Sequence, residues 1–271
     1  MSTVIPNERL AQTDAHEGPV YVAAEQALSF TTQRAGRRVD IMRLSLADGR
    51  ISTVLADANA ANGMTLDRDG RLIVCEQHPA AISRIDPASG RRETVVDAYR
   101  GLSLNSPNDV VAKSDGSIWF TDPSYAYLQG FGPEPQLGDH VYRHDGELEL
   151  AAHGFDKPNG LAFSPDESVL YVGDSEACLI DAFDVVDGRR LANRRRFATI
   201  EKGFPDGLKT DREGNVHTTG GPGLLVFSPS GVLLREIDLP GAVNFAFAGS
   251  RLLVTADDAI WAVDLTPTEG A

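Results

Sequence analysis

Paired apolar runs joined by a short polar turn recur along the whole chain. In "NDVVAKSDGSIWFTD", for example, a Ser-Asp-Gly turn connects two strand-like runs, and Asn-Asp precedes the first of them. The runs are rich in Val, Ile, Leu, Phe and Thr, which favour strands, and the turns are rich in Asp and Gly, as tight hairpins require. One polar residue opens each of the six pairs, and these residues are Glu17, Asn62, Asn108, Asn159, Asp206 and Asn244.

The spacing of these hairpins predicts the fold. The opening residues recur at intervals of 38 to 51 residues, which is long enough for a unit of four strands. Further strand-like runs, such as "HVYRHD" and "GELELAA", follow the hairpins, and no segment has a clear helical period. We therefore predict an all-β protein, a six-bladed β-propeller with four-stranded blades, in which residues 1–271 form one domain. A β-sandwich with many hairpins is the alternative.

The last repeat predicts how the ring closes. It runs from about residue 243 to 265 and contains only three strand-like runs. The segment "ERLAQTDA", which precedes Glu17, is expected to supply the missing outer strand. Closure by this N-terminal strand would hide sheet edges that otherwise invite aggregation.

Composition and charge limit the classes of molecule that the protein is expected to bind. The 271-residue chain is 42% hydrophobic and carries a formal net charge of −14, which argues against binding to nucleic acid or to anionic membranes, because both need a basic patch. It contains no long uncharged apolar run, and its first residues lack the apolar core of a signal peptide. We expect a cytoplasmic protein that acts on a small molecule.

The six opening residues are the first candidates for a site. The first strand of every propeller blade lines the central channel, so these residues should converge at one mouth of the channel. Glu17 and Asp206 would supply two negative charges, and Asn108 and Asn159 two amide oxygens, a donor set that suits Ca²⁺, Mg²⁺ or Mn²⁺. A closed zinc site is disfavoured because the set has no His or Cys. The alternative is that these residues only begin turns and cap strands, above all Asn62 and Asn244.

A second tier of polar residues should lie near the same mouth. The second strand of four hairpins ends in an acid, and these acids are Glu76, Asp122, Asp174 and Asp257. They could support the site, hold a second cation, or only solvate and cap loops, and we predict Asp122 as a substrate contact. His78 follows the second strand of its blade and is also predicted to contact substrate. The irregular segment 126–140 is a candidate lid or pocket wall.

The chain resembles the family that joins gluconolactonases with regucalcin, also called senescence marker protein. The motifs that carry the resemblance are "SPNDVVAKSDGSIWFTDPSY", "KPNGLAFSPDESVLYV" and "FPDGLKTDREGNV", with a weaker match at "EGPVY". The resemblance implies a six-bladed propeller with one divalent metal ion. It places the metal ligands on Glu17, Asn159 and Asp206, with Asn108 as a further ligand or a substrate contact. It also implies that Asp206 is the catalytic base and that Asp109 contacts substrate.

These inferences predict a metal-dependent hydrolase that opens a lactone, such as a sugar lactone or a similar small cyclic ester. The cation, with Ca²⁺ as first choice and Zn²⁺, Mg²⁺ or Mn²⁺ as alternatives, would polarise the carbonyl, and activated water would attack it. Either Asp206 or the cation itself would activate that water. Two alternatives remain open: a phosphotriester (organophosphate) hydrolase that uses the same metal site, and a calcium-binding regulatory propeller without catalysis.

Overall fold

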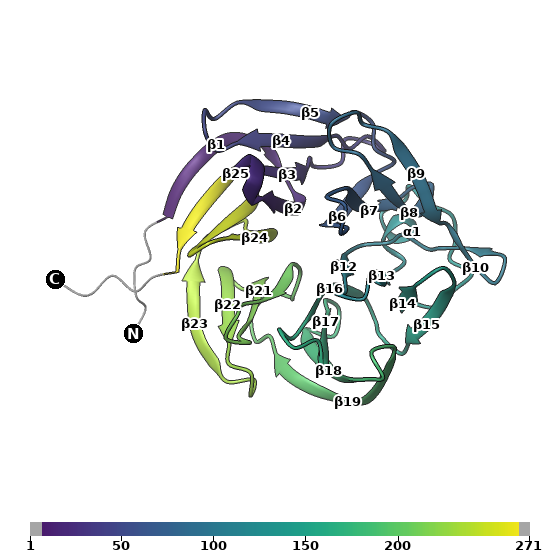
Figure 1. Cartoon of the computed structure of the whole chain (residues 1–271). Coiled ribbons are helices and arrows are strands. Elements are labelled where there is room, and N and C mark those ends of the chain that lie inside the picture. Colours follow the sequence, from purple (N-terminus) through teal and green to yellow (C-terminus); the bar gives the residue numbers. More distant parts are fainter. Residues whose placement is uncertain (1–6, 266–271) are drawn as a thin grey trace.

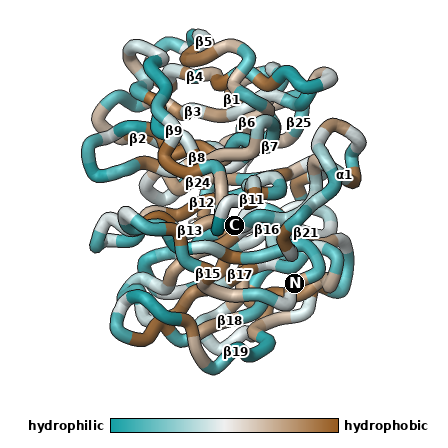
Figure 2. The backbone as a smooth tube through the Cα atoms, turned by 90° about the vertical axis from the view of Figure 1, so that its right-hand side faces the viewer, coloured by the Kyte–Doolittle hydropathy of each residue, from teal (hydrophilic) through white to brown (hydrophobic). Residues whose placement is uncertain are grey.

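Six small antiparallel sheets follow one another around a ring in the computed structural model, which describes residues 7–265 (Figure 1). The prediction of an all-β, six-bladed propeller is therefore confirmed. The two ends of the predicted domain, residues 1–6 and 266–271, lie outside the described residues. In the side view of the ring, the segment that contains α1 projects beyond the sheets (Figure 2). Neither of the two short helices in residues 7–265 is long and apolar enough to cross a membrane.

The chain builds one sheet after another, and each blade runs from its inner to its outer strand. Blade 1 contains β2 (Glu17–Val22), β3 (Ala27–Thr31), β4 (Ile41–Ser45) and β5 (Ile51–Leu55). Blade 2 contains β6 (Ala61–Leu66), β7 (Leu72–Gln77), β8 (Ala80–Ile85) and β9 (Arg92–Val96). Blade 3 contains β12 (Val110–Ala112), β13 (Ile118–Asp122), β14 (His140–His144) and β15 (Leu148–Ala152).

The later blades repeat this order. Blade 4 contains β16 (Pro158–Phe163), β17 (Val169–Asp174), β18 (Leu179–Val186) and β19 (Arg190–Thr199). Blade 5 contains β20 (Leu208–Thr210), β21 (Val216–Gly220), β22 (Gly223–Phe227) and β23 (Leu233–Asp238). Blade 6 contains β24 (Asn244–Ala248), β25 (Arg251–Asp264) and β1 (Asn7–Ala15). The remaining elements are the 3-10 turn η1 (Ala23–Glu25), the short ribbon β10 (Ala98–Tyr99) and β11 (Leu102–Ser103), and the single-turn helix α1 (Tyr125–Leu128).

The N-terminal strand closes the ring, as the sequence predicts. β1 pairs antiparallel with β25, with Asn7 opposite Val263 and Ala15 opposite Asp257. The sixth sheet has three strands and the other five have four, because the long strand β25 lies between β24 and β1 and pairs with both. Its first part, residues 251–255, pairs with β24, and its later part, residues 257–263, pairs with β1.

The hydrophobic core lies between neighbouring blades. Each of six buried clusters joins two adjacent sheets. One cluster, for example, packs Ile41 of blade 1 against Leu72 of blade 2, and the cluster that seals the ring packs Ile260 of blade 6 against Phe30 of blade 1. Burial of these large side chains fixes each blade against the next, so the inner strands all begin near one mouth of the channel.

Glycines allow the inner strands to approach each other closely at this mouth. The Gly160 N–H donates to the carbonyl oxygen of Asp206 in the next blade at 3.1 Å, and the Gly63 N–H donates to the carbonyl oxygen of Asn108 at 2.8 Å. A Cβ atom on Gly160 would lie 2.1 Å from the Asp206 carbonyl oxygen. The glycine after Asn159 is therefore required for the contact that brings Asn159 and Asp206 together.

We expect Gly160→Ala to destabilise the fold, because the added methyl group meets rigid backbone rather than a flexible side chain. The free energy of unfolding should fall by about 2 kcal/mol or more, as measured by urea denaturation. Gly220→Ala is the matched control, since its Cβ would meet nothing nearer than 3.3 Å. An equal, small effect of both substitutions would contradict the close approach.

Candidate active site at the mouth of the channel

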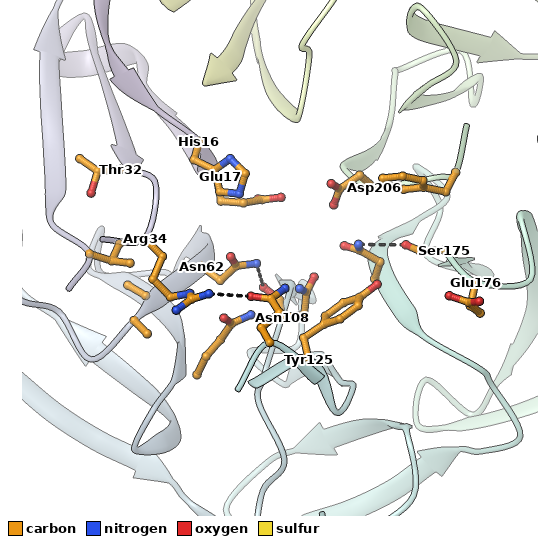
Figure 3. A pocket seen from close by; sticks show the side chains of 17 residues that line it. His16, Glu17, Thr32, Arg34, Asn62, Asn108, Tyr125, Ser175, Glu176 and Asp206 are labelled. Atoms are coloured by element: carbon orange, nitrogen blue, oxygen red, sulfur yellow. Dashed lines mark hydrogen bonds between the residues drawn. The ribbon is translucent and has the colours of Figure 1, made fainter. Parts of the chain in front are cut away.

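A cavity of about 370 Å³ opens at the end of the channel where the inner strands begin (Figure 3). Five of the six opening residues line it, each from a different blade: Glu17, Asn62, Asn108, Asn159 and Asp206. The structure therefore brings together all four predicted metal ligands. The sixth opening residue, Asn244, lies directly behind this wall, where its side-chain amide donates to Glu17 Oε2 at 2.8 Å.

Glu17 is held by donors that fix one of its two oxygens. It begins β2 and is only 4% exposed. Oε2 accepts the Asn244 amide and also the backbone N–H of Gly18, at 2.9 Å. These two hydrogen bonds keep the carboxylate aimed into the cavity, and Asn244 therefore positions Glu17 instead of only beginning a strand.

Asn108 presents an oxygen with no hydrogen-bond partner. Its backbone is fixed, because its N–H donates to the Thr121 carbonyl at 2.9 Å and its carbonyl accepts the Asn62 side-chain amide at 3.1 Å. The Oδ1 atom of Asn108 is buried, and none of the described residues donates a hydrogen bond to it. Buried acceptors are nearly always paired, so this oxygen is suited to a ligand or a cation.

Two cavity residues that the sequence analysis does not single out surround Asn159. The Asn159 side-chain NH₂ donates to Ser175 Oγ at 3.0 Å, and Ser175 in turn donates to the Pro205 carbonyl at 2.7 Å. Tyr125, the first residue of α1, lines the cavity beside them. Burial raises the pKa of Tyr125 to about 12, which leaves its hydroxyl protonated and able to donate at neutral pH.

Asp206 and Glu17 bring two interacting carboxylates into one cavity. Burial, and secondly the charge of Glu17, raise the pKa of Asp206 well above its usual range, while the Asn159 amide acts in the opposite direction. Convergent carboxylates of this kind favour either a bound cation or a shared proton. Figure 3 shows Glu17 and Asp206 facing each other across the cavity.

The acids of the second tier in blades 3 and 4 organise loops. Asp122 accepts the backbone N–H groups of Asn105 and Ser106, at 2.9 and 2.8 Å. Asp174 accepts the equivalent pair, Asp156 and Lys157, at 2.8 and 2.9 Å. Each bonded pair lies just before the asparagine that enters the cavity. These carboxylates therefore set the position of Asn108 and Asn159 from behind.

The other two acids of this tier have different partners. Glu76 is fully buried and is held by the Arg92 guanidinium at 2.6 Å and by Ser83 Oγ at 2.8 Å. Asp257 contacts His16 Nδ1 at 2.7 Å, and the His16 ring lines the cavity next to Glu17. Loop capping, one of the alternatives predicted for this tier, thus describes Asp122 and Asp174, whereas Glu76 forms a buried ion pair and Asp257 contacts a residue of the cavity wall.

The structure does not bring three predicted substrate contacts into the cavity wall. Asp122 is fully buried behind it, with both carboxylate oxygens bonded as described above. Asp109 is also buried; its Oδ1 accepts the Val110 N–H at 2.8 Å, and burial raises its pKa to about 7. His78 lies one residue beyond Gln77, which does line the cavity, and its ring packs edge-on to Phe131.

The donor set fits an oxygen-seeking cation. Within residues 7–265 no group of three His, Cys, Asp or Glu side chains is arranged to hold a metal ion. The wall instead combines two carboxylates, Glu17 and Asp206, with carboxamides, and the unpartnered Oδ1 of Asn108 is an acceptor that a cation would satisfy. Hard cations such as Ca²⁺ and Mg²⁺ prefer sets of this composition.

Known proteins are similar to this chain in fold and in sequence. A gluconolactonase from Zymomonas mobilis is 32% identical over 248 residues, which cover 82% of this chain and 68% of that protein. The solved structure of a gluconolactonase from Xanthomonas campestris superposes with a TM-score of 0.88 at 37% identity, over 96% of this chain and 89% of that one. Regucalcin from Danio rerio is 36% identical over 109 residues, 38% of this chain and 35% of that protein.

These relatives and the carboxylate-lined cavity define the class of the protein, which is a propeller lactonase, a hydrolase of carboxylic esters. The chain belongs to the SMP-30/gluconolactonase/LRE-like family, whose model matches residues 15–257. The family resemblance seen in the sequence is thereby confirmed.

Proposed function

We propose that this protein opens a sugar lactone with the help of one divalent cation, for which Ca²⁺ is the first choice. Glu17, Asn159 and Asp206 would hold the cation, with Asn108 as a further ligand. The observation that carries the proposal is the convergence of two interacting carboxylates and an unpartnered amide oxygen in one cavity. The gluconolactonase relatives support the choice of substrate.

A cation bound there would polarise the lactone carbonyl and stabilise negative charge on its oxygen. The residues of the chain supply the remaining steps. A water molecule forms a bond to the carbonyl carbon while the Asp206 carboxylate accepts its proton. The bond between this carbon and the ring oxygen then breaks, Asp206 returns the proton to the ring oxygen, and a hydroxy acid results.

Neutral donors in the cavity orient the substrate. The Tyr125 hydroxyl remains protonated, and Asn62 lines the same wall. Both can hydrogen-bond to lactone hydroxyl or carbonyl oxygens without adding charge. Glu17 and Asn159 are fixed from behind by Asn244 and Ser175, so the site needs little rearrangement when the substrate binds.

The experiment that tests the proposal removes the metal and restores it. Protein stripped with a chelator should release no acid from glucono-δ-lactone, as followed with a pH indicator and corrected for spontaneous hydrolysis. Addition of single divalent ions should restore turnover, with Ca²⁺ among the active ones. Turnover that survives complete removal of metal would overturn the metal-dependent mechanism.

The same assay separates the alternatives. Paraoxon offered in place of the lactone tests the phosphotriester hydrolase, which predicts a higher kcat/KM for the phosphotriester than for any lactone. Tight calcium binding without turnover of either substrate would favour a regulatory protein. Two carboxylates that meet in an open cavity favour catalysis, since a cation that only stabilised the fold could be enclosed completely.

A further inference from the structure

The cavity contains one permanent positive charge whose role the proposed reaction leaves open. Arg34 is the one Lys or Arg residue that lines the cavity in the described part of the chain. It comes from the loop between β3 and β4 in blade 1. Figure 3 shows its side chain extending into the cavity from the side of Asn62, with Asp206 on the far side.

Neutral groups hold the Arg34 guanidinium in place. One NH₂ group donates to Gln129 Oε1 at 3.2 Å, and the other donates to the Gly36 carbonyl. The guanidinium carbon lies 3.9 Å from the centre of the Phe131 ring, a cation–π contact. Gln129 and Phe131 follow α1 in blade 3, so residues from two blades orient this side chain.

No carboxylate within residues 7–265 forms an ion pair with Arg34. The contrast within the same loop is clear, because Arg38 forms a two-point pair with Asp40, at 3.1 and 3.0 Å. A guanidinium stacked on a ring, with its charge uncompensated and part of its donor edge open, is well suited to bind a carboxylate or phosphate.

Charge in the cavity is distributed unevenly. Glu176, from the loop after β17, lines the side opposite Arg34 (Figure 3). With Glu17 and Asp206 neutralised by a divalent cation, Arg34 and Glu176 are the remaining permanent charges of the wall. An anionic group on a substrate would therefore be drawn towards blade 1 and kept away from blade 4.

We propose that Arg34 determines substrate specificity by binding an anionic group remote from the lactone ring, so that the preferred substrates are acidic lactones that carry a carboxylate or a phosphate. This inference rests on the lactonase function proposed above and adds its substrate class. The cavity, of about 370 Å³, lies within the usual range for small-molecule sites.

Three lactones test the inference. Wild-type protein should have a higher kcat/KM for D-glucaro-1,4-lactone, which carries a carboxylate, or for 6-phosphoglucono-δ-lactone than for neutral glucono-δ-lactone. Arg34→Gln should lower kcat/KM for the preferred acidic lactone by about 10- to 100-fold, mainly through KM. It should lower the value for the neutral lactone much less. The acidic lactone that loses more identifies the anionic group.

Control variants separate binding from support of the loop. Arg34→Lys keeps the charge and should recover part of the lost preference. Arg38→Gln removes the same charge from the same loop, outside the cavity, and should leave the ratio of acidic to neutral turnover unchanged. Glu176→Gln should raise the ratio slightly. An equal loss on acidic and neutral lactones, or no loss on the acidic ones, would overturn the role of Arg34.

If the protein is not a lactonase, wild-type protein should hydrolyse none of the three lactones, which differs from every outcome that tests Arg34. Calorimetric titration with 6-phosphogluconate would still decide the role of Arg34, since we expect binding to wild-type protein that weakens at least tenfold in Arg34→Gln. Equal binding to both proteins would refute anion recognition by Arg34.

Discussion

Asp206→Asn should reduce kcat/KM for glucono-δ-lactone by about 1,000-fold or more while the fold stays intact. The side chain keeps its size, but it loses both the group that accepts the proton from water and one of the two charges that favour a cation. The initial rate of acid release at saturating Ca²⁺ measures the effect. Circular dichroism in the β-sheet region should match that of the wild type.

Stability provides an independent check of the same variant. In the wild-type protein without metal, burial and repulsion by the charge of Glu17 disfavour the ionised form of Asp206 and raise its pKa well above the usual range. The asparagine removes this repulsion, so the unfolding midpoint in chelator should equal or exceed that of the wild type. Asp187→Asn, in an exposed turn of blade 4 where Asp187 is 79% exposed and pairs with Arg190, is the control and should retain activity. Wild-type activity in Asp206→Asn would remove Asp206 from the mechanism.

The sequence predicts the blades because each blade is a local structure. The two inner strands of a blade are joined by a turn of a few residues, and apolar runs and Asp-Gly turns mark them directly. The regular spacing of six such hairpins then leaves few ways to bury every sheet. Even the closing strand β1 is predictable, since the last repeat lacks a strand and the chain before Glu17 contains one.

The convergence of the proposed metal ligands is predictable for the same reason. Glu17, Asn159 and Asp206 occupy equivalent places in their repeats, and propeller symmetry brings equivalent places together. A glycine follows each of these three residues, for a physical reason that the repeat alone does not reveal. At Gly160 the backbone of the next blade occupies the space that a side chain would need.

The second tier shows where repeat symmetry stops being informative. Asp122 and Asp174 do return to the mouth, as expected, but the loop before the inner strand covers them and uses their oxygens for its own N–H groups. The sequence contains a signal for this arrangement. In "NSPN" and "DKPN" the loop residues that donate to these carboxylates stand at the same distance before Asn108 and Asn159.

The other residues that line the cavity are less accessible to sequence reasoning. Tyr125, Ser175 and Arg34 come from the connections between the second and third strands of three blades, and these connections differ in length and sequence. Arg34 is oriented by Gln129, about a hundred positions away in the chain. Only the folded ring shows that these loops meet over one cavity, so the convergence of the opening residues can be predicted from the sequence while the loop residues that join them cannot.

Glu17→Gln should weaken the affinity for Ca²⁺ by about 100-fold or more, because affinity at such sites depends on the number of charged ligands. The amide retains the size of the side chain and one oxygen, but only one carboxylate then remains to balance a divalent ion. Calorimetric titration of chelator-treated protein with Ca²⁺ measures the affinity. The activity of the variant should return in part at high Ca²⁺, in contrast to Asp206→Asn.

Two further variants show whether the effect belongs to a ligand or to general charge. Asn244→Ala removes the amide that holds Glu17 Oε2 at 2.8 Å, and a loss of about tenfold is expected from such a supporting residue. Glu176→Gln removes the same charge as Glu17→Gln from the exposed side of the cavity and should change the affinity by less than about threefold, since solvent screens that charge. If Glu17→Gln and Glu176→Gln weakened binding equally, Glu17 would act only through its charge at a distance. The metal would then have to be held by other residues.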